Sequence, residues 1–360
     1  MVFGVRRILE LDPLTGKVQR HLGVTRLDHG QIAGHVRDFS RPALPTIDYG
    51  LSMRLGVLDV GSNTVHLLVV DAHRGGQPTP QLSRKSVLRL AEHIDKRGDL
   101  ALEGADALVG AALGARRQAK ELECDEFLAF ATSAVRDARN SAEVLARVAD
   151  ESGVKLEVLT GADEATLTFL AVRRWFGWSA GRLLCLDIGG GSLELGVGEH
   201  EVPEVALSVP LGAGRLTREW LDGDPPSRQS VEKLREYVGS ELAGPAKKLL
   251  HPSRPDRVVA SSKTFRTLAR LTGAAPSKEG PQVPRNLQIN GLRQVIGFIS
   301  RMAAADLAEL DGVSAARAHQ TLAGAIVAEQ AMLALGVSRF ELCPWALREG
   351  VILRRLDAIG

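Results

Sequence analysis

Two glycine-rich turns in the sequence each follow an acidic residue that ends an apolar run. The first is Asp59-Val60-Gly61-Ser62-Asn63-Thr64, and the second is Asp187-Ile188-Gly189-Gly190-Gly191-Ser192. Glycine lets the backbone approach an anion closely, and successive N–H groups in such turns form anion-binding nests. We therefore predict two phosphate loops. Their phosphate-binding residues are expected to be Gly61, Ser62, Asn63 and Thr64, and Gly189, Gly190, Gly191 and Ser192.

A plain hairpin turn is the competing interpretation of both segments. It is weaker for the second, because each of three consecutive glycines carries a conformational cost of about 0.5–1 kcal/mol in a strand or helix. A fold keeps such a run where a ligand must approach the backbone closely.

Three carboxylates near these turns suit a metal ion. Glu194 follows Ser192 by two positions, so on a strand the two side chains lie on one face. Asp187 and Glu194 then form a carboxylate pair for Mg²⁺, and Asp59 is placed to hold Mg²⁺ or its waters, since oxygen ligands are those that Mg²⁺ prefers.

Two further segments each leave two interpretations open. Arg136 follows an apolar strand and can bind phosphate bidentately. Spacing alone favours a surface ion pair with Asp137 or Asp125 instead. Asp163 and Glu164 begin a helix, where acids complement the helix dipole. One of them can equally act as the carboxylate that deprotonates a water molecule.

A basic stripe and a polar segment complete the candidates. Lys263, Arg266 and Arg270 recur at i, i+3 and i+7, one face of a helix, and are candidate polyanion contacts. Spacing alone favours a solvated face. Residues 347–350, LREG, are interpreted as a salt bridge at a helix start.

The elements around these residues predict an α/β protein with a mixed sheet and an internal repeat. Apolar strands are expected on both sides of each glycine-rich turn, so two similar domains would each begin with a β-hairpin. Their hairpins would face each other across a cleft. The predicted strands are 55–60, 65–71, 82–90, 127–133, 155–159, 183–187, 193–198, 258–261 and 340–344, with helices over 103–122, 141–150 and 163–175 and mostly helical structure over 213–360.

Composition narrows the class of protein. With 360 residues, 44% hydrophobic, the chain has room for two globular domains, and a net charge of +2 gives no sign of a nucleic-acid partner. Three scattered cysteines fit a reducing compartment, and no apolar run is long enough for a membrane span or signal peptide. We expect a cytoplasmic protein. Residues 1–52 are expected to be a loose extension or a non-native start before Met53, in preference to a small β-rich arm.

Seven motifs together resemble the exopolyphosphatase/guanosine pentaphosphatase (Ppx/GppA) family. They are DVGSNT, ATSAVRDA, TGADEA, DIGGGSLEL, VPLGAGRLT, ASSKTF and LREG, in the family's order across residues 53–360. The chain looks most like its short, two-domain actinobacterial exopolyphosphatases. The resemblance implies two actin-like (ribonuclease H-like) domains of the acetate and sugar kinase/Hsc70/actin superfamily with an interdomain cleft. The expected domains are 53–170 and 171–345, with 346–360 packing on the first.

The resemblance also implies roles. Glu164 matches the family's catalytic base, and Asp163 stands where the family usually has Glu. Asp187 and Glu194 match its Mg²⁺ positions, and Arg136 its phosphate contact. The implied activity is Mg²⁺-assisted hydrolysis of the terminal phosphoanhydride of inorganic polyphosphate, with short chains favoured because the helical domains of long members do not follow. A homodimer is implied, and K⁺ activation is left open.

Three other functions remain open at this stage. Removal of the 5′-phosphate of pppGpp uses the same bond and the same motifs. A sugar or acetate kinase of the superfamily would have to exclude water and hold an acceptor molecule. Glu164 suits the activation of water better than the binding of an acceptor. A non-catalytic protein that senses ppGpp or another nucleotide would keep the fold without turnover.

Overall fold

The computed structural model describes residues 8–11, 18–21 and 52–359. The chain divides into two compact units, Met1–Ile47 and Asp48–Gly360. In the first unit, strands β1 (Ile8–Leu11) and β2 (Val18–His21) pair antiparallel. Apart from these eight residues and residue 52, the expected extension 1–52 lies outside the described residues.

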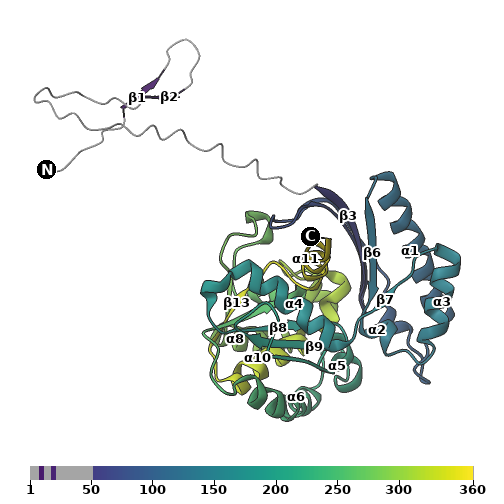
Figure 1. Ribbon diagram of the computed structural model, residues 1–360. Helices are drawn as coiled ribbons and strands as arrows, with labels where there is room; N and C mark the ends of the chain where they lie inside the picture. The colour runs from purple at the N-terminus through teal and green to yellow at the C-terminus, as the bar shows by residue number, and fades with distance from the viewer. Residues whose placement is uncertain (1–7, 12–17, 22–51, 360) are drawn as a thin grey trace, which may run out of the picture. The chain divides into compact units, whose positions relative to one another are not determined.

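The second unit begins with a five-stranded mixed sheet (Figure 1). Its strands are β3 (Met53–Val60), β4 (Thr64–Ala72), β5 (Thr79–Val87), β6 (Glu126–Ala131) and β7 (Glu157–Val158), in the order β5-β4-β3-β6-β7. β3 pairs antiparallel with β4 and parallel with β6. β3 and β4 are apolar along most of their length because both faces of this sheet are covered, whereas the edge strand β5 is largely exposed and polar.

A second mixed sheet repeats this arrangement. Its strands are β8 (Leu183–Ile188), β9 (Leu193–Gly198), β10 (Val205–Val209), β11 (Arg257–Ser261), β12 (Asn286–Gln288) and β13 (Arg339–Leu342), in the order β10-β9-β8-β11-β13-β12. Without the short edge strand β12, each sheet places its third, second, first, fourth and fifth strands in that order. The predicted α/β class with an internal repeat is therefore confirmed.

Helices cover the faces of the two sheets. They are α1 (Leu102–Glu121), α2 (Ser133–Arg136), α3 (Ser141–Ser152), α4 (Gly161–Phe176), α5 (Ala213–Trp220), α6 (Arg228–Leu249), α7 (Ser262–Leu271), α8 (Ile289–Ile299), α9 (Ala304–Ala308), α10 (Thr321–Leu335) and α11 (Leu347–Ile359). Short 3-10 turns are η1 (Leu90–His93), η2 (Trp178–Ala180), η3 (Ser277–Glu279) and η4 (Ala315–Gln320). None of the described helices combines the length and the apolar run that crossing a bilayer requires.

Each face of the first sheet has its own apolar core. On the outer face, α1 and α3 bury residues such as Leu108 and Val148 against β3 and β4 (Figure 1). On the inner face, Leu167 of α4 and Ile352 of α11 pack with Leu55 of β3. The second sheet packs α4 on one face and the large core containing α6, α7 and α10 on the other.

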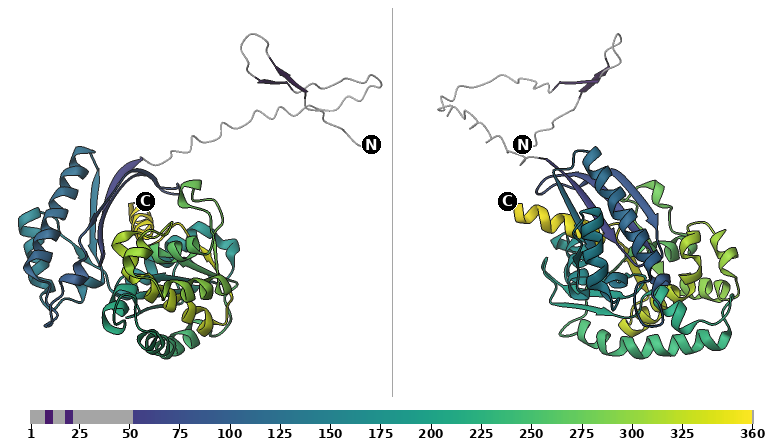
Figure 2. Two further views of the ribbon diagram at one scale, coloured as in Figure 1. Left: turned by 180° about the vertical axis from the view of Figure 1, so that it is seen from behind. Right: turned by 90° about the vertical axis from the view of Figure 1, so that its right-hand side faces the viewer.

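Helices α4 and α11 pack against each other at very short range. A Cβ atom on Gly350 would lie 2.0 Å from the carbonyl oxygen of Leu167, so only glycine allows this approach. Figure 2 shows α11, in yellow, beside the strands of the first sheet. The segment expected to return to the first domain thus packs on both that sheet and α4.

Several element boundaries differ from the prediction. The strand predicted to reach residue 133 ends at Ala131, and α2 begins at Ser133. The N–H groups of Val135 and Arg136 donate to the carbonyl oxygen of Thr132, which turns the chain into a helix there. Strands β10 and β12 were not predicted; β12 has only three residues, and β10 is one short VALSV segment.

Candidate active site

The two glycine-rich turns lie at one cavity of about 280 Å³. In each turn the first glycine N–H donates to the carbonyl oxygen three residues later: Gly61 to Thr64 at 3.1 Å and Gly189 to Ser192 at 2.9 Å. The two turns are therefore closed by the same hydrogen bond. This equivalence extends the repeat of the two sheets from strand order to turn geometry.

The two turns also touch each other. A Cβ atom on Gly190 would lie 2.9 Å from Cβ of Ser62, and one on Gly191 would lie 2.5 Å from Oγ of Ser133. The hydroxyls of Ser62 and Ser133 are 2.9 Å apart. The predicted arrangement, with hairpins facing each other across a cleft, is present. Of the expected phosphate-binding residues in the turns, all but Gly191 line the cavity.

The three predicted metal carboxylates all line the same cavity. Asp187 lies directly opposite Glu194 on the neighbouring strands β8 and β9, so the predicted carboxylate pair is formed. In the first sheet, Asp59 of β3 lies opposite His66 of β4, so His66 occupies the position equivalent to Glu194. Ser261 donates to Asp187 Oδ2 at 2.6 Å, and Ser208 donates to Glu194 Oε1 at 3.0 Å.

Burial raises the pKa of every one of these carboxyls. Desolvation raises the pKa of Asp187 to about 6, although the Ser261 hydrogen bond lowers it in part. It raises the pKa of Asp59, which Arg348 partly offsets. The pKa of Glu194 is raised well above its usual range by burial and then by the nearby charge of Glu164. Burial thus disfavours the ionised form of these carboxyls, and a bound cation would favour it.

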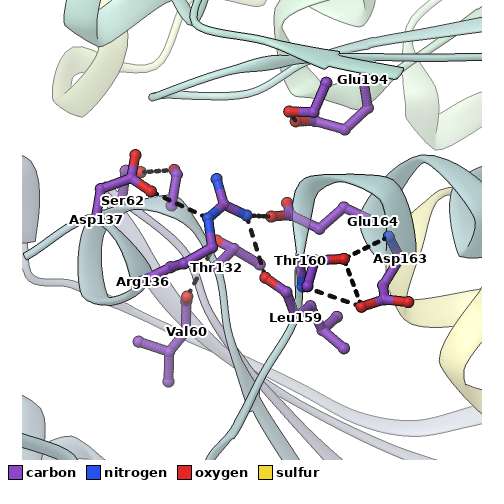
Figure 3. A network of polar contacts seen from close by, with 12 residues as sticks. Val60, Ser62, Thr132, Arg136, Asp137, Leu159, Thr160, Asp163, Glu164 and Glu194 are labelled. Atoms are coloured by element: carbon purple, nitrogen blue, oxygen red, sulfur yellow. Dashed lines mark hydrogen bonds and ion pairs between the residues drawn. The ribbon is translucent and has the colours of Figure 1, made fainter. Parts of the chain in front are cut away.

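Asp163 and Glu164 are neighbours in the first turn of α4, but their side chains have different surroundings. Thr160 and Asp163 form a capping box, in which the Asp163 N–H donates to Thr160 Oγ1 at 3.1 Å and the Asp163 carboxylate accepts the Thr160 N–H (Figure 3). Asp163 is exposed, whereas Glu164 is only 6% exposed and lines the cavity. One acid therefore caps the helix, and the other faces the site.

Burial raises the pKa of Glu164 to about 7, with Arg136 opposing the shift. Arg136 Nη1 donates to Glu164 Oε1 and to the carbonyl oxygen of Leu159, and Nε pairs with Asp137 at 3.0 Å (Figure 3). Arg136 is not among the residues that line the cavity. Its guanidinium therefore makes the Asp137 pair that spacing favoured, and it also holds Glu164.

The basic stripe divides between the cavity and the surface. Lys263 and Arg266 line the cavity. Arg270, one helical turn further on α7, donates to the carbonyl oxygen of Ala274 and pairs with Asp311. Arg270 is not among the cavity residues.

Four residues with basic side chains that line the cavity were not predicted: His66, Lys85, Arg317 and Arg348. Arg317 Nη2 lies 3.5 Å from Thr64 Oγ1. Arg348 belongs to the segment interpreted as a helix-start salt bridge. In the structure Glu349 instead accepts the Ala346 N–H at 2.8 Å, and Arg348 faces the cavity. The polar LREG segment could have identified Arg348 as a site residue. No local sequence pattern identifies Lys85 or Arg317.

The donor set limits how a metal could bind. Within residues 8–11, 18–21 and 52–359, no group of three or more His, Cys, Asp or Glu side chains is arranged to hold an ion by itself. The carboxylates that line the cavity supply oxygen ligands only. Mg²⁺ usually binds through one or two carboxylates, waters and substrate phosphates. The residues therefore fit Mg²⁺ bound together with a phosphate substrate, and do not fit an ion held by protein ligands alone.

Known proteins resemble this chain over most of its length. The model of the Ppx/GppA phosphatase family matches residues 69–359. Exopolyphosphatase 1 of Mycobacterium tuberculosis is 63% identical over 306 residues, which are 85% of this chain and 89% of that protein; its Mycobacterium leprae counterpart is 61% identical over 85% of this chain and 90% of that protein. The crystal structure of an exopolyphosphatase from Cytophaga hutchinsonii aligns with a TM-score of 0.77 at 24% identity, covering 85% of this chain and 98% of that one. The chain belongs to the Ppx/GppA phosphatase family.

Proposed function

We propose that this protein hydrolyses the terminal phosphoanhydride bond of inorganic polyphosphate. The observation that carries the proposal is Glu164, a buried carboxylate that faces a cavity enclosed by two glycine-rich turns. The relatives at 61–63% identity are named exopolyphosphatases, which supports the same activity in this chain.

The terminal phosphoryl group is placed between the two turns. Asn63 Nδ2 is buried and has no hydrogen-bond partner among the described residues, so a phosphate oxygen would satisfy it. The hydroxyls of Ser62, Thr64 and Ser192, with the turn backbone, supply further donors. Lys263 and Arg266 are assigned to the polyanion, and Arg270 is left out because it pairs with Asp311.

Glu164 is assigned as the general base. It orients a water molecule for in-line attack on phosphorus and accepts the water's proton, and a pKa near neutrality suits that exchange. Arg136 is a positioning residue in this scheme, since it donates to Glu164. A direct Arg136–phosphate contact would require Arg136 to leave that pair.

Asp187 and Glu194 would hold Mg²⁺, with Asp59 binding it or its waters. Bound there, the ion neutralises charge that develops on the phosphate oxygens. The protein's own part is to fix the phosphoryl group, the water and the base in one geometry, which accounts for most of the acceleration in phosphoryl transfer.

The test is Mg²⁺-dependent phosphate release from short polyphosphate, long polyphosphate, pppGpp and ATP, measured side by side. We expect polyphosphate to give the highest kcat/KM, and Glu164→Gln to lower kcat by about 100-fold or more. Turnover of Glu164→Gln within a few-fold of the wild type would remove Glu164 as the base. A higher kcat/KM for pppGpp than for polyphosphate would show that pppGpp, and not polyphosphate, is the preferred substrate.

Asp163→Asn is the matched control, because Asp163 is the neighbouring acid on the same helical turn. Asn keeps an oxygen acceptor for the capping box, so we expect stability to fall by at most about 1 kcal/mol. Its kcat should stay within about threefold of the wild type, since Asp163 does not line the cavity.

A further inference from the structure

A second cavity of about 510 Å³ adjoins the first. Five residues line both: His66, Lys85, Lys263, Arg266 and Arg348. Four of the five are cations. The second cavity then continues past β5 to the segment between α7 and β12, where Pro80 and Ser277 are exposed. It therefore connects the reaction cavity with solvent along a line of positive charge.

The outer wall of the second cavity is held in a fixed shape. Arg285 donates to four backbone carbonyl oxygens, at 2.7–3.0 Å, all within residues 275–283. Its guanidinium is therefore used to fold the segment rather than to bind a ligand. Because this wall is internally bonded, the second cavity is a feature of the folded segment and not of a loose loop.

The charged side chains that line the second cavity are mostly positive. Among the described residues that line it, Glu349 is the sole acid, and its carboxylate accepts the Ala346 N–H. Lys85, Arg266 and Arg348 form no ion pair with Glu349. Arg348 and Arg266 also lie near Asp59 and Asp187 of the first cavity, whereas the charges near Lys85 are those of other cations. Such a surface attracts a flexible polyanion, and the attraction is screened by salt.

The side chains that line the two cavities suit a phosphate chain better than a base. None of the described residues that line either one is Phe, Tyr or Trp. Bases are commonly bound by stacking on aromatic side chains, worth about 1–3 kcal/mol per base. A linear phosphate chain needs only cations and hydrogen-bond donors, which are the side chains present.

We propose that the leaving part of a linear polyphosphate extends from the reaction cavity into the second cavity, where Lys85, Arg266 and Arg348 bind it. This inference rests on the proposed function, because it assumes that the terminal phosphate reacts at Glu164. The second cavity is then the route of the polyphosphate chain, and it is the part of the protein that distinguishes long substrates from short ones.

Ser277 offers a test outside the reaction cavity. It lines the second cavity alone, is exposed, and begins η3, where an acid is tolerated. We compare kcat/KM for tripolyphosphate and for a chain of tens of phosphates in the wild type, Ser277→Glu and Ser277→Gln. Lys278→Gln changes the net charge by the same amount as Ser277→Glu, at a neighbouring exposed residue that does not line the cavity.

Ser277→Glu should lower kcat/KM for the long chain by about fivefold, in line with one charge contact at a partly exposed site. Tripolyphosphate should stay within about twofold, and both Gln variants should resemble the wild type. Equal effects on both substrates, or none on either, would overturn the route while leaving the hydrolase intact. If the wild type releases phosphate from neither substrate, the proposed function fails and the route fails with it.

Discussion

Gly190 and Ser62 meet across the cleft so closely that a methyl group on Gly190 would lie 2.9 Å from Cβ of Ser62. Gly190→Ala must therefore push the two turns apart. Because a displacement of about 1 Å at a catalytic site can cost 100-fold in rate, we expect kcat/KM to fall by about that factor. Steady-state phosphate release would measure it.

Gly110→Ala is the control for this change. Gly110 lies on α1 with no atom within 4 Å of its added Cβ. Alanine there should raise the free energy of unfolding by up to about 1 kcal/mol, because glycine is unfavourable inside a helix. Its kcat/KM should not change. A Gly190→Ala enzyme with full activity would show that the turns do not need this spacing.

The pH dependence of kcat/KM should report Glu164. Its pKa of about 7 lies in the free protein, and a base acts in its deprotonated form, so log kcat/KM should rise with pH and level off above neutrality. Arg136 lowers that pKa, so Arg136→Gln should move the rising limb to higher pH. Arg147→Gln, which removes an arginine that pairs with Glu151 and Asp106, should leave the limb in place. A shift to lower pH in Arg136→Gln would contradict the assignment.

Stability without divalent cations should depend on Asp187. Its folded pKa of about 6 lies above the unfolded value of 3.8, so the folded state holds the proton longer. The contribution of Asp187 to stability should therefore fall as pH rises from about 4 to 6, by about 3 kcal/mol in all, and stay constant above that.

Asp187→Asn removes this titration. The difference in free energy of unfolding between variant and wild type should grow in favour of the variant from pH 4 to 6, measured by urea denaturation in the presence of a chelator. Parallel curves would mean that Asp187 is ionised with no penalty. Added Mg²⁺ should stabilise the wild type more than Asp187→Asn at neutral pH, since ligand binding to the folded state stabilises it.

Gly350→Ala should separate α11 from α4. Its Cβ would lie 2.0 Å from the Leu167 carbonyl oxygen, so the helices must move, and overpacking of this kind costs about 1–3 kcal/mol or more. Urea denaturation would measure the loss. Gly297→Ala on α8, with open space around it, should instead leave stability equal or higher. Equal stability of the two variants would show that the helix pair relaxes at no cost.

The fold was readable from sequence where local pattern and burial agree. Apolar runs on both sides of each glycine-rich turn predicted the β3–β4 and β8–β9 hairpins, and their similarity predicted the repeat. Strand β12 has only three residues, too few to show an alternation, and was not predicted. Strand β10 was missed although Val205, Leu207 and Val209 alternate with small residues in it.

The site was readable only in part, because position in the tertiary structure decides what a charged side chain does. Arg266 and Arg270 share one stripe on α7, yet only Arg266 lines the cavity. Lys85 and Arg317 come from a polar edge strand and a short 3-10 turn, where an isolated cation reads as surface. Family resemblance, not spacing, distinguished Glu164 from Asp163.

The packing of α11 on β3 has a consequence for how the protein is made. The inner face of the first sheet buries Leu55 against Ile352, residues at opposite ends of the second unit. During synthesis that apolar face stays incompletely covered until α11 has emerged from the ribosome, because Leu167 of α4 supplies only part of its packing. The core on the inner face of the first sheet therefore cannot be completed before the rest of the second unit has been made, and contacts between such distant parts of a chain form slowly. A nascent chain stalled before α11 would present this face to chaperones, whereas the released chain would not.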